Sequence, residues 1–149
     1  MDLKFIKIPS ADGKIIDTPQ YATDGSACFD LVCNLDDAIV IKSNEIAKIP
    51  TGIAIELESN LLVALVYPRS GLSSKFGISL ANCVGVVDSD YRGQIFVPLV
   101  NNSDVDFTLK PDERIAQLAV MPILKPTLIE VENLSETTRG SGGFGSTGK

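Results

Sequence analysis

The glycine-rich segment from Arg139 to Lys149 contains residue types that bind phosphate. Its spacing Gly143-x-x-x-x-Gly148-Lys149 is most of a Walker A loop, the turn that cradles phosphates in many nucleotidases. A Walker A loop needs a strand before it, and a Ser or Thr and a helix after it, and the sequence shows neither flank. We therefore do not expect a P-loop nucleotidase fold.

The chemistry of a phosphate site is nevertheless present in this segment. Glycines let backbone N–H groups turn toward an anion. Ser146 and Thr147 add hydroxyl donors, and the guanidinium of Arg139 can pair with two phosphate oxygens. Phe144 has nothing local to pack on and could stack on a base. The alternative is a flexible, disordered tail without a ligand.

Pro68-Arg69-Ser70-Gly71 is a second possible anion site. Pro68 ends the apolar run that precedes it, and Ser70 is suited to cap a short helix. A helix N-terminus beside an arginine binds phosphate well. The simpler interpretation is an ordinary strand-to-helix turn.

Three more polar positions interrupt apolar segments. Gly85–Gly93 is typical of a hairpin with two carboxylates, Asp88 and Asp90, and a tyrosine. An ionised aspartate beside a phosphate site could hold a water or a sugar hydroxyl, although aspartates also cap turns. Asp30 lies among apolar neighbours, which is unusual unless it is paired or near an ion. Gln117 lies within a strand that otherwise suits the core.

Composition narrows the possible chemistry. The 149 residues include no histidine, which excludes Ser-His-Asp and Cys-His catalysis and HExxH zinc sites. Carboxylates, hydroxyls, backbone N–H groups, Arg or Lys, or a bound ion must then do the work. The net charge of −6 argues against a nucleic-acid partner. Cys28, Cys33 and Cys83 form no C-x-x-C pair and indicate free thiols.

Short strands must position these residues. Ile53–Leu57 and Val105–Leu109 alternate apolar and polar residues and predict half-buried strands, whereas Leu61–Tyr67 predicts a strand buried on both faces. Further strands are predicted at 95–100, 115–121 and 127–131, and one short helix at 72–76. The pattern predicts an all-β sandwich, jelly roll or barrel.

The organisation is that of a single domain. We predict one β domain at residues 1–134 and a tail at 135–149. No apolar stretch reaches the roughly 18 residues of a membrane span, and the N-terminus lacks the pattern of a secretory signal. We therefore expect an intracellular, cytoplasmic protein with no membrane partner.

Taken in order, five segments resemble the five motifs of the homotrimeric dUTP pyrophosphatases (dUTPases). They are residues 24–31, 68–71, 85–93, 113–117 and 139–148. The resemblance covers nearly the whole chain. One departure is Cys28-Phe29, where the family usually has Gly-Tyr or Gly-Leu before the aspartate corresponding to Asp30.

The resemblance implies a distorted jelly-roll β-barrel that assembles as a homotrimer. Active sites would lie at subunit interfaces, and each would be closed by the C-terminal tail of the third subunit. The implied reaction is hydrolysis of dUTP to dUMP and pyrophosphate by attack of water at the α-phosphorus. This reaction keeps uracil out of DNA and supplies dUMP for dTMP synthesis.

The resemblance also implies residue roles. Asp88 would orient the attacking water and hold the sugar 3′-hydroxyl, and Tyr91 would pack on the deoxyribose and leave no room for a 2′-hydroxyl. Mg²⁺ would bridge the phosphates, and Asp30 would hold it through water. The residues that would read uracil are Asn82, Gly85, Val86 and Val87, and those that would contact the phosphates are Arg69, Ser70, Gly71 and Gln117. In the tail, the phosphates would be clamped by Arg139, Gly145, Ser146 and Thr147, and Phe144 would stack on uracil.

Two other functions remain open. A dCTP deaminase of the same fold would need a Glu beside the pyrimidine, but Gln94 follows Gly93. A non-catalytic trimeric nucleotide-binding regulator would be expected to lack Asp88, Tyr91 or the tail, and all are present.

Overall fold

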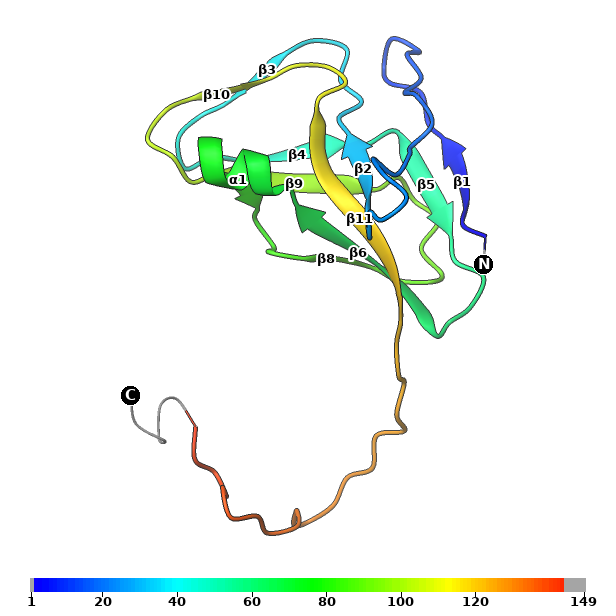
Figure 1. The fold of residues 1–149 in the computed structure, drawn as a ribbon, viewed down its shortest axis with the longest axis vertical. Helices are drawn as coiled ribbons and strands as arrows, with labels where there is room; N and C mark the ends of the chain where they lie inside the picture. The colour runs from blue at the N-terminus through cyan, green and yellow to red at the C-terminus, as the bar shows by residue number, and fades with distance from the viewer. Residues whose placement is uncertain (1, 144–149) are drawn as a thin grey trace.

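Short strands dominate residues 2–143, the part of the chain that the computed structural model describes (Figure 1). One short helix, α1 (Ser70–Phe76), lies between two of them. The strands are β1 (Lys4–Lys7), β2 (Phe29–Val32), β3 (Ile39–Ile41), β4 (Ile46–Pro50), β5 (Ile53–Glu56), β6 (Leu62–Pro68), β7 (Ile78–Leu80), β8 (Gly85–Val87), β9 (Phe96–Asn101), β10 (Phe107–Leu109) and β11 (Arg114–Pro122).

The strands pair antiparallel in four sheets. The largest has the order β2-β11-β6-β8, a second has the order β4-β9-β7, and two-stranded sheets join β1 to β5 and β3 to β10. The predicted β-rich fold with at most one short helix is confirmed within the described residues. Their hydrogen-bonded ladders form separate sheets and do not close into one continuous barrel.

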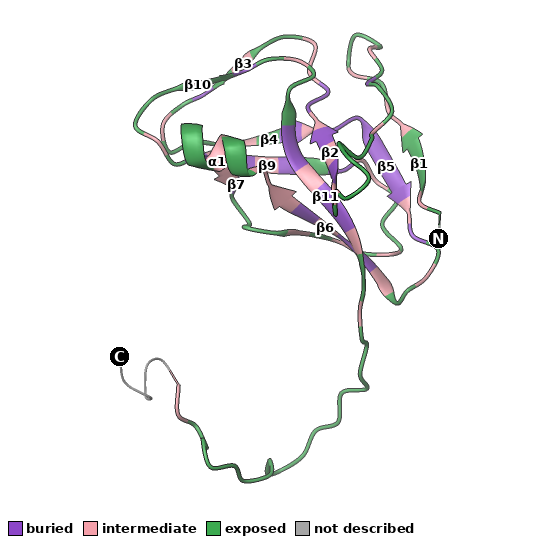
Figure 2. Ribbon diagram, viewed as in Figure 1, coloured by how far each residue is buried: buried purple, intermediate pink, exposed green. Residues whose placement is uncertain are grey.

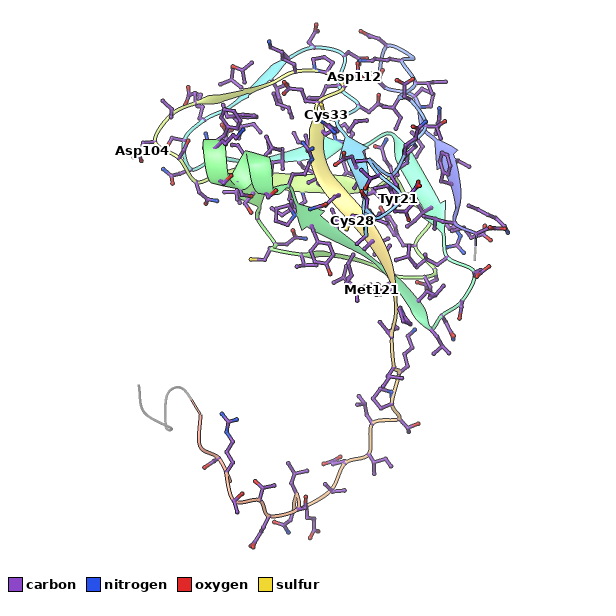
Figure 3. The ribbon with its side chains drawn as sticks, viewed as in Figure 1. Tyr21, Cys28, Cys33, Asp104, Asp112 and Met121 are labelled. Carbon is purple, nitrogen blue, oxygen red and sulfur yellow. The ribbon has the colours of Figure 1, made fainter. Side chains whose placement is uncertain are left out.

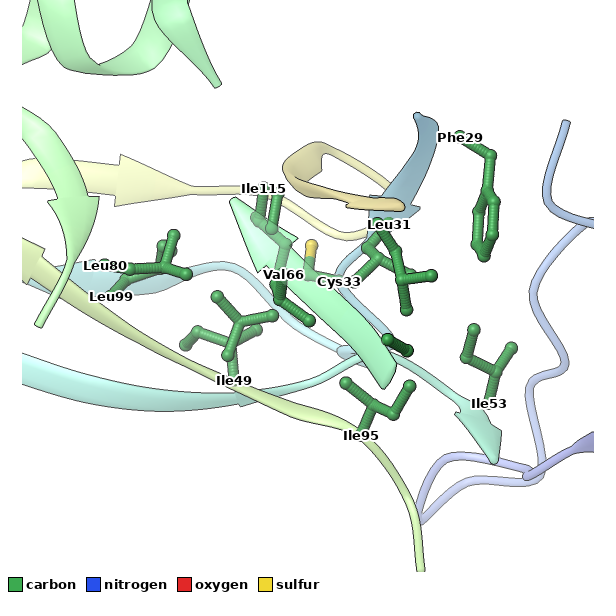
Figure 4. Packing of buried hydrophobic residues seen from close by; sticks show 14 of the residues in the cluster. Phe29, Leu31, Cys33, Ile49, Ile53, Val66, Leu80, Ile95, Leu99 and Ile115 are labelled. Carbon is green, nitrogen blue, oxygen red and sulfur yellow. The ribbon is translucent and has the colours of Figure 1, made fainter. Parts of the chain in front are cut away.

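Branched aliphatic side chains fill the core between these sheets. Ile49 and Leu99 come from the β4-β9-β7 sheet, while Leu31, Ile115 and Val66 come from the large sheet (Figure 4). Figure 2 shows the buried positions concentrated on β2, β5, β6, β9 and β11. Burying one such side chain stabilises the fold by roughly 1.5–3 kcal/mol, so this core holds the large sheet in place.

The strands predicted at Leu61–Tyr67, 95–100 and 115–121 are found as β6, β9 and β11. The predicted half-burial of β5 is wrong, because Ala54 is buried together with Ile53 and Ile55. A small apolar side chain such as Ala54 does not indicate which face of a strand meets solvent. Val105 is 72% exposed and lies outside β10.

The strand predicted at 127–131 is wrong for the single chain. The N–H of Ile123 still donates to the carbonyl of Leu61 at 2.8 Å, but residues 123–130 then form no strand. Leu128 and Ile129 are 92% and 77% exposed. Apolar residues form a strand only beside another edge, and the chain leaves the body here without meeting one (Figure 1).

The helix begins at Ser70, two residues before the predicted range 72–76. Arg69 is its N-cap, with φ −91° and ψ 130°, and no side chain caps it. Ser70 is therefore the first helical residue, so the predicted capping role of Ser70 is wrong: Arg69 continues the extended backbone of β6 and takes that position. Gly77 ends the helix in the left-handed region at φ 70°, where a side chain would be strained.

None of the helical structure described is long and apolar enough to cross a membrane. Beyond β11, residues 123–143 run as an extended, largely exposed segment, which we call the C-terminal arm. The predicted boundary between domain and tail at 134/135 lies within this arm and stays a prediction.

Candidate active site

Two of the predicted polar positions, Asp30 and Gln117, lie side by side with Tyr67 across the large sheet. In the register of the strands, Gln117 on β11 faces Asp30 on β2 and Tyr67 on β6. Directly opposed residues of antiparallel strands project from the same face. The neighbouring row, Phe29, Leu118 and Val66, is buried in the core. Asp30, Gln117 and Tyr67 therefore share the outer face.

Two arginines hold the carboxylate of Asp30. Arg69 Nε donates to Asp30 Oδ1 at 2.9 Å, and Arg114 Nη1 donates to Asp30 Oδ2 at 3.2 Å. Arg69 Nη1 also donates to the carbonyl of Arg114 at 3.3 Å. One carboxylate and two guanidinium groups leave a net positive charge, as an anion site requires.

Gln117 is tied to the turn that follows β6. Its Nε2 donates to the carbonyl of Pro68 at 3.0 Å. Gln117 thereby links β11 to the start of the Arg69-Ser70-Gly71 segment. One amide N–H is used in this bond, and the other is available to a ligand.

A pocket of about 260 Å³ lies on the other side of β6, around β8. The hairpin residues Asn82, Gly85, Val86, Val87 and Asp88 line it, together with Tyr91. The structure thus brings the predicted uracil-reading residues, Asp88 and Tyr91 into one pocket. The remaining lining residues are Lys48, Val66, Leu80, Gln94, Ile95, Phe96 and Pro98.

Close packing sets the position of this hairpin against β6. Gly85 pairs with Val66, and a Cβ at Gly85 would lie 3.1 Å from the Cβ of Val66. Cys83 turns the chain with a left-handed φ of 62°, and the N–H of Val84 donates to the carbonyl of Asn82 at 2.6 Å. The absence of a side chain at Gly85 lets β8 approach β6 and shape the pocket.

Tyr91 is held from both ends of the loop after β8. Its hydroxyl donates to the carbonyl of Gln94 at 2.9 Å, and its N–H donates to the carbonyl of Asp88 at 3.2 Å. The ring is packed so closely on Gly93 that a Cβ there would overlap the hydroxyl. Tyr91 still has 45% of its surface exposed, so one part of it can meet a ligand.

Lys48 and Phe96 are among the pocket residues that sequence reasoning missed. They come from the neighbouring strands β4 and β9, and Lys48 Nζ lies 4.3 Å from the centroid of the Phe96 ring. The one signal in the sequence was Lys48 itself, a charged residue within an otherwise apolar strand. Their strand pairing is long-range and cannot be inferred from local spacing.

The pKa of the Cys28 thiol, two residues before Asp30, is raised from its ordinary value. Burial, and secondly the negative charge of Asp30, raise the pKa of the Cys28 thiol. Burial also raises the pKa of Cys33. All three cysteines are free, as their spacing predicts.

The side chains around Asp30 are only a partial match for the Mg²⁺ site that the resemblance implies. No group of three or more His, Cys, Asp or Glu side chains that could cage a metal is found in residues 2–143. Asp30 is the predicted contact, and both of its oxygens already accept bonds from arginines. This set fits an ion that is carried by substrate phosphates and touched through water.

The tail residues are less fully described. Phe144, Gly145, Ser146 and Thr147 lie outside the described residues. Arg139 is exposed, and its Nε donates to the carbonyl of Gly142 at 2.9 Å. Figure 1 shows this end of the arm well away from the strands of its own chain. Any contact of Arg139 with the pocket requires a different placement of the arm or a second copy of the chain.

Comparison with known proteins identifies the class. The dUTPase family model matches residues 14–148. The deoxyuridine 5′-triphosphate nucleotidohydrolase of Desulfitobacterium hafniense is 50% identical over 130 residues, covering 87% of this chain and 86% of that protein. The enzyme of the same name from Nitrosospira multiformis is 47% identical over 148 residues, covering 99% of each. The chain belongs to the dUTPase family.

Solved structures agree with this assignment. The dUTPase of Staphylococcus bacteriophage 80alpha with dUpNHpp has a TM-score of 0.85 at 26% identity, covering 99% of each chain. A mutant dUTPase of phage phi11 of S. aureus, described as revealing the coordination of a structural Mg(II) ion, has a TM-score of 0.76 at 23% identity and covers 89% of this chain and 98% of its own. This second likeness shows the fold alone.

Proposed function

We propose that the chain hydrolyses dUTP to dUMP and pyrophosphate, using the pocket around β8 for the nucleoside and the cluster of Asp30, Arg69 and Arg114 for the phosphates. The activity follows from membership of the family and from relatives at 44–50% identity that carry its enzyme name. The observation that supports this placement is the sheet order: β6 lies between β8, which lines the pocket, and β11, which carries Gln117. The comparisons give no support to the deaminase or the regulator.

Asp88 is assigned to the attacking water. It lines the pocket, is exposed to solvent, and follows directly after β8. An aspartate is ionised at neutral pH, so it accepts a hydrogen bond from a water and fixes the direction of its lone pair. Orientation of this kind can supply a large part of the rate increase.

The pocket supports selection of uracil and deoxyribose. Backbone groups of Gly85–Val87 and the Asn82 amide offer donors and acceptors that a base must match, and a mismatched buried polar group is costly. The Tyr91 ring, fixed by Gln94 and Gly93, is placed to pack on the sugar and exclude a 2′-hydroxyl.

The phosphates are assigned to Arg69, Ser70, Gly71 and Gln117, with Arg139, Gly145, Ser146 and Thr147 of the tail as a clamp and Phe144 stacked on the base. Arg69 and Gln117 each retain N–H groups beyond those used in the observed bonds. Mg²⁺ carried by the phosphates, with Asp30 as its contact through water, would neutralise charge on the pyrophosphate leaving group.

A homotrimer is part of the proposal. The C-terminal arm exposes Leu124, Leu128, Ile129, Val131 and Leu134, each by 57–95%. Exposed apolar surface of this kind commonly marks a site of interaction with another protein. An arm that covers a second copy would also carry Arg139 and the tail to a neighbouring site. A cytoplasmic location is likewise proposed, and three free cysteines suit its reducing conditions.

A pyrophosphate-release assay with Mg²⁺ tests the activity. We expect turnover of dUTP and little turnover of dTTP, dCTP or UTP. Ammonia release from dCTP would instead identify a deaminase, and absence of turnover with intact dUTP binding would identify a regulator.

A further inference from the structure

A β-bulge places Arg114 on the site face of the large sheet. Along β11, Leu118, Gln117 and Ala116 pair with Phe29, Asp30 and Leu31 of β2, and the register then shifts between Ala116 and Arg114. Arg114 pairs with Val32, whereas unbroken pairing would set it opposite Cys33. One extra residue in a strand turns the next side chain to the other face.

The direction of this change is clear from burial. Cys33 is 0% exposed and Ile115, the extra residue, is 1% exposed, so both belong to the core. Val32 lies two residues from Asp30 on the same strand and therefore on the same, outer face. Without the bulge, the guanidinium of Arg114 would point into the core. With it, Arg114 reaches Asp30.

Arg114 contacts both other members of the cluster. Its Nη1 donates to Asp30 Oδ2 at 3.2 Å, and its carbonyl accepts a bond from Arg69 Nη1 at 3.3 Å. Asp30 in turn accepts from Arg69 Nε at 2.9 Å. The Arg69 guanidinium is therefore fixed at two of its nitrogens by groups that Arg114 supplies or holds.

These bonds leave one edge of Arg69 for a ligand. Nε and one N–H of Nη1 are used, so both N–H groups of Nη2 can donate elsewhere. Arg69 and Arg114 also line a hollow of about 500 Å³ beside α1 and β10. The side chain of Arg69 is 27% exposed, less than the 56% of Arg114.

We infer that Arg114 is a positioning residue of the phosphate site, which acts through Asp30 and Arg69. The bulge at Ile115 is what brings Arg114 to that place. Arg114 holds Asp30 from one side, Asp30 and the Arg114 carbonyl hold Arg69, and Arg69 donates to the phosphates. The inference rests on the proposed function, since it concerns the same triphosphate.

Binding of dUpNHpp, a nonhydrolysable triphosphate, compared with binding of deoxyuridine, tests this role by calorimetry. Arg114→Met should weaken dUpNHpp binding roughly tenfold, the effect of a lost charged hydrogen bond. Deoxyuridine binding should stay unchanged, because the pocket around β8 does not include Arg114. The loss should persist without Mg²⁺. Lys4→Met is the matched control, because it breaks an exposed ion pair of the same 3.2 Å length, with Glu56.

A double-mutant cycle separates positioning from direct contact. If Arg114 acts through Arg69, Arg69→Met combined with Arg114→Met should bind dUpNHpp no more weakly than Arg69→Met alone. Additive losses would mean that Arg114 touches phosphate itself and would overturn the inference. Equal losses for deoxyuridine and dUpNHpp, or a loss seen only with Mg²⁺, would overturn it too. Failure of the unmodified protein to bind dUpNHpp would instead reject the proposed function.

Discussion

At the scale of the residue, two aspartates of one site have opposite surroundings. Asp30 has both carboxylate oxygens bonded to guanidinium groups, at 2.9 and 3.2 Å. Asp88 lies at the pocket, exposed to solvent, and within the described residues no side chain bonds its carboxylate. Asp30, whose two oxygens are both bonded, is suited to hold the neighbouring arginines. Asp88 can accept a hydrogen bond from a water.

Replacing Asp88 tests its assignment. Asp88→Asn keeps the shape and removes the charge, so we expect dUpNHpp binding to persist while kcat falls by roughly 10²-fold or more. Steady-state pyrophosphate release and calorimetry measure the two effects. Asp104→Asn is the control, because that exposed carboxylate lies outside the pocket. Near-normal turnover of Asp88→Asn would reject the role.

Cys33 gives the fold a dependence on alkaline pH. Burial raises the pKa of its thiol, so the unfolded chain loses this proton at a lower pH than the folded protein. The stability is complete below the unfolded pKa of about 8.5 and is lost as pH rises through the folded pKa, by at most about 1.4 kcal/mol per pH unit. Urea unfolding between pH 8 and 10 should show a shallower decline for Cys33→Ala, and an identical slope would contradict this.

At the scale of the element, the hairpin and loop around β8 depend on glycine at close contacts. Gly85 allows β8 to approach β6, and Gly93 allows the Tyr91 ring to lie close against the loop. The pocket is shaped by backbone approach as much as by its side chains. Under the proposed function, selection of the base and the sugar would depend on this loop as a unit.

Gly93→Ala should relax the selection of the sugar. The new Cβ would overlap the Tyr91 hydroxyl and displace the ring from its bond to Gln94. We expect the ratio of kcat/KM for dUTP over UTP to fall by about tenfold or more, since one or two hydrogen-bond energies separate the substrates. Gly25→Ala is the control, because a Cβ at Gly25 would meet no atom within 4 Å beyond its chain neighbours. An unchanged ratio would argue against Tyr91 as the sugar gate.

At the scale of the whole molecule, the exposed apolar arm supports the proposed assembly of several copies of the chain. In the part of the chain that the structure describes, Leu124, Leu128, Ile129, Val131 and Leu134 are 57–95% exposed, and Figure 2 shows the arm as exposed along most of its length. The side chains of the arm stand away from the strands in Figure 3. Assembly would bury them and bring Arg139 within reach of a neighbouring site.

Two truncations separate the parts of the arm. Ending the chain after Thr138 keeps the apolar residues, so we expect an intact trimer with kcat/KM reduced by at least tenfold because Arg139 and the glycine segment are gone. Ending it after Pro122 removes the apolar residues as well and should give monomers. Light scattering after gel filtration measures the mass. A monomer from the first truncation, or a trimer from the second, would contradict this role of the arm.

Local patterns were enough for much of this protein. Alternation and apolar runs predicted β6, β9 and β11, because core burial imposes the pattern on each strand separately. The same signals failed at 127–131, where apolar residues are present but no strand edge lies beside them. They also missed the burial of Ala54, whose small side chain is compatible with either face.

By itself, the sequence determined the class of protein, since the order and spacing of five motifs name the family whatever their positions in space. It also determined which carboxylates, arginines and glycines are available to the site. Only the tertiary structure decided that Asp30, Gln117 and Tyr67 form one row, that Arg114 turns outward at a bulge, and that Lys48 and Phe96 join the pocket. Strand order and register depend on packing between distant segments, and no local pattern encodes them.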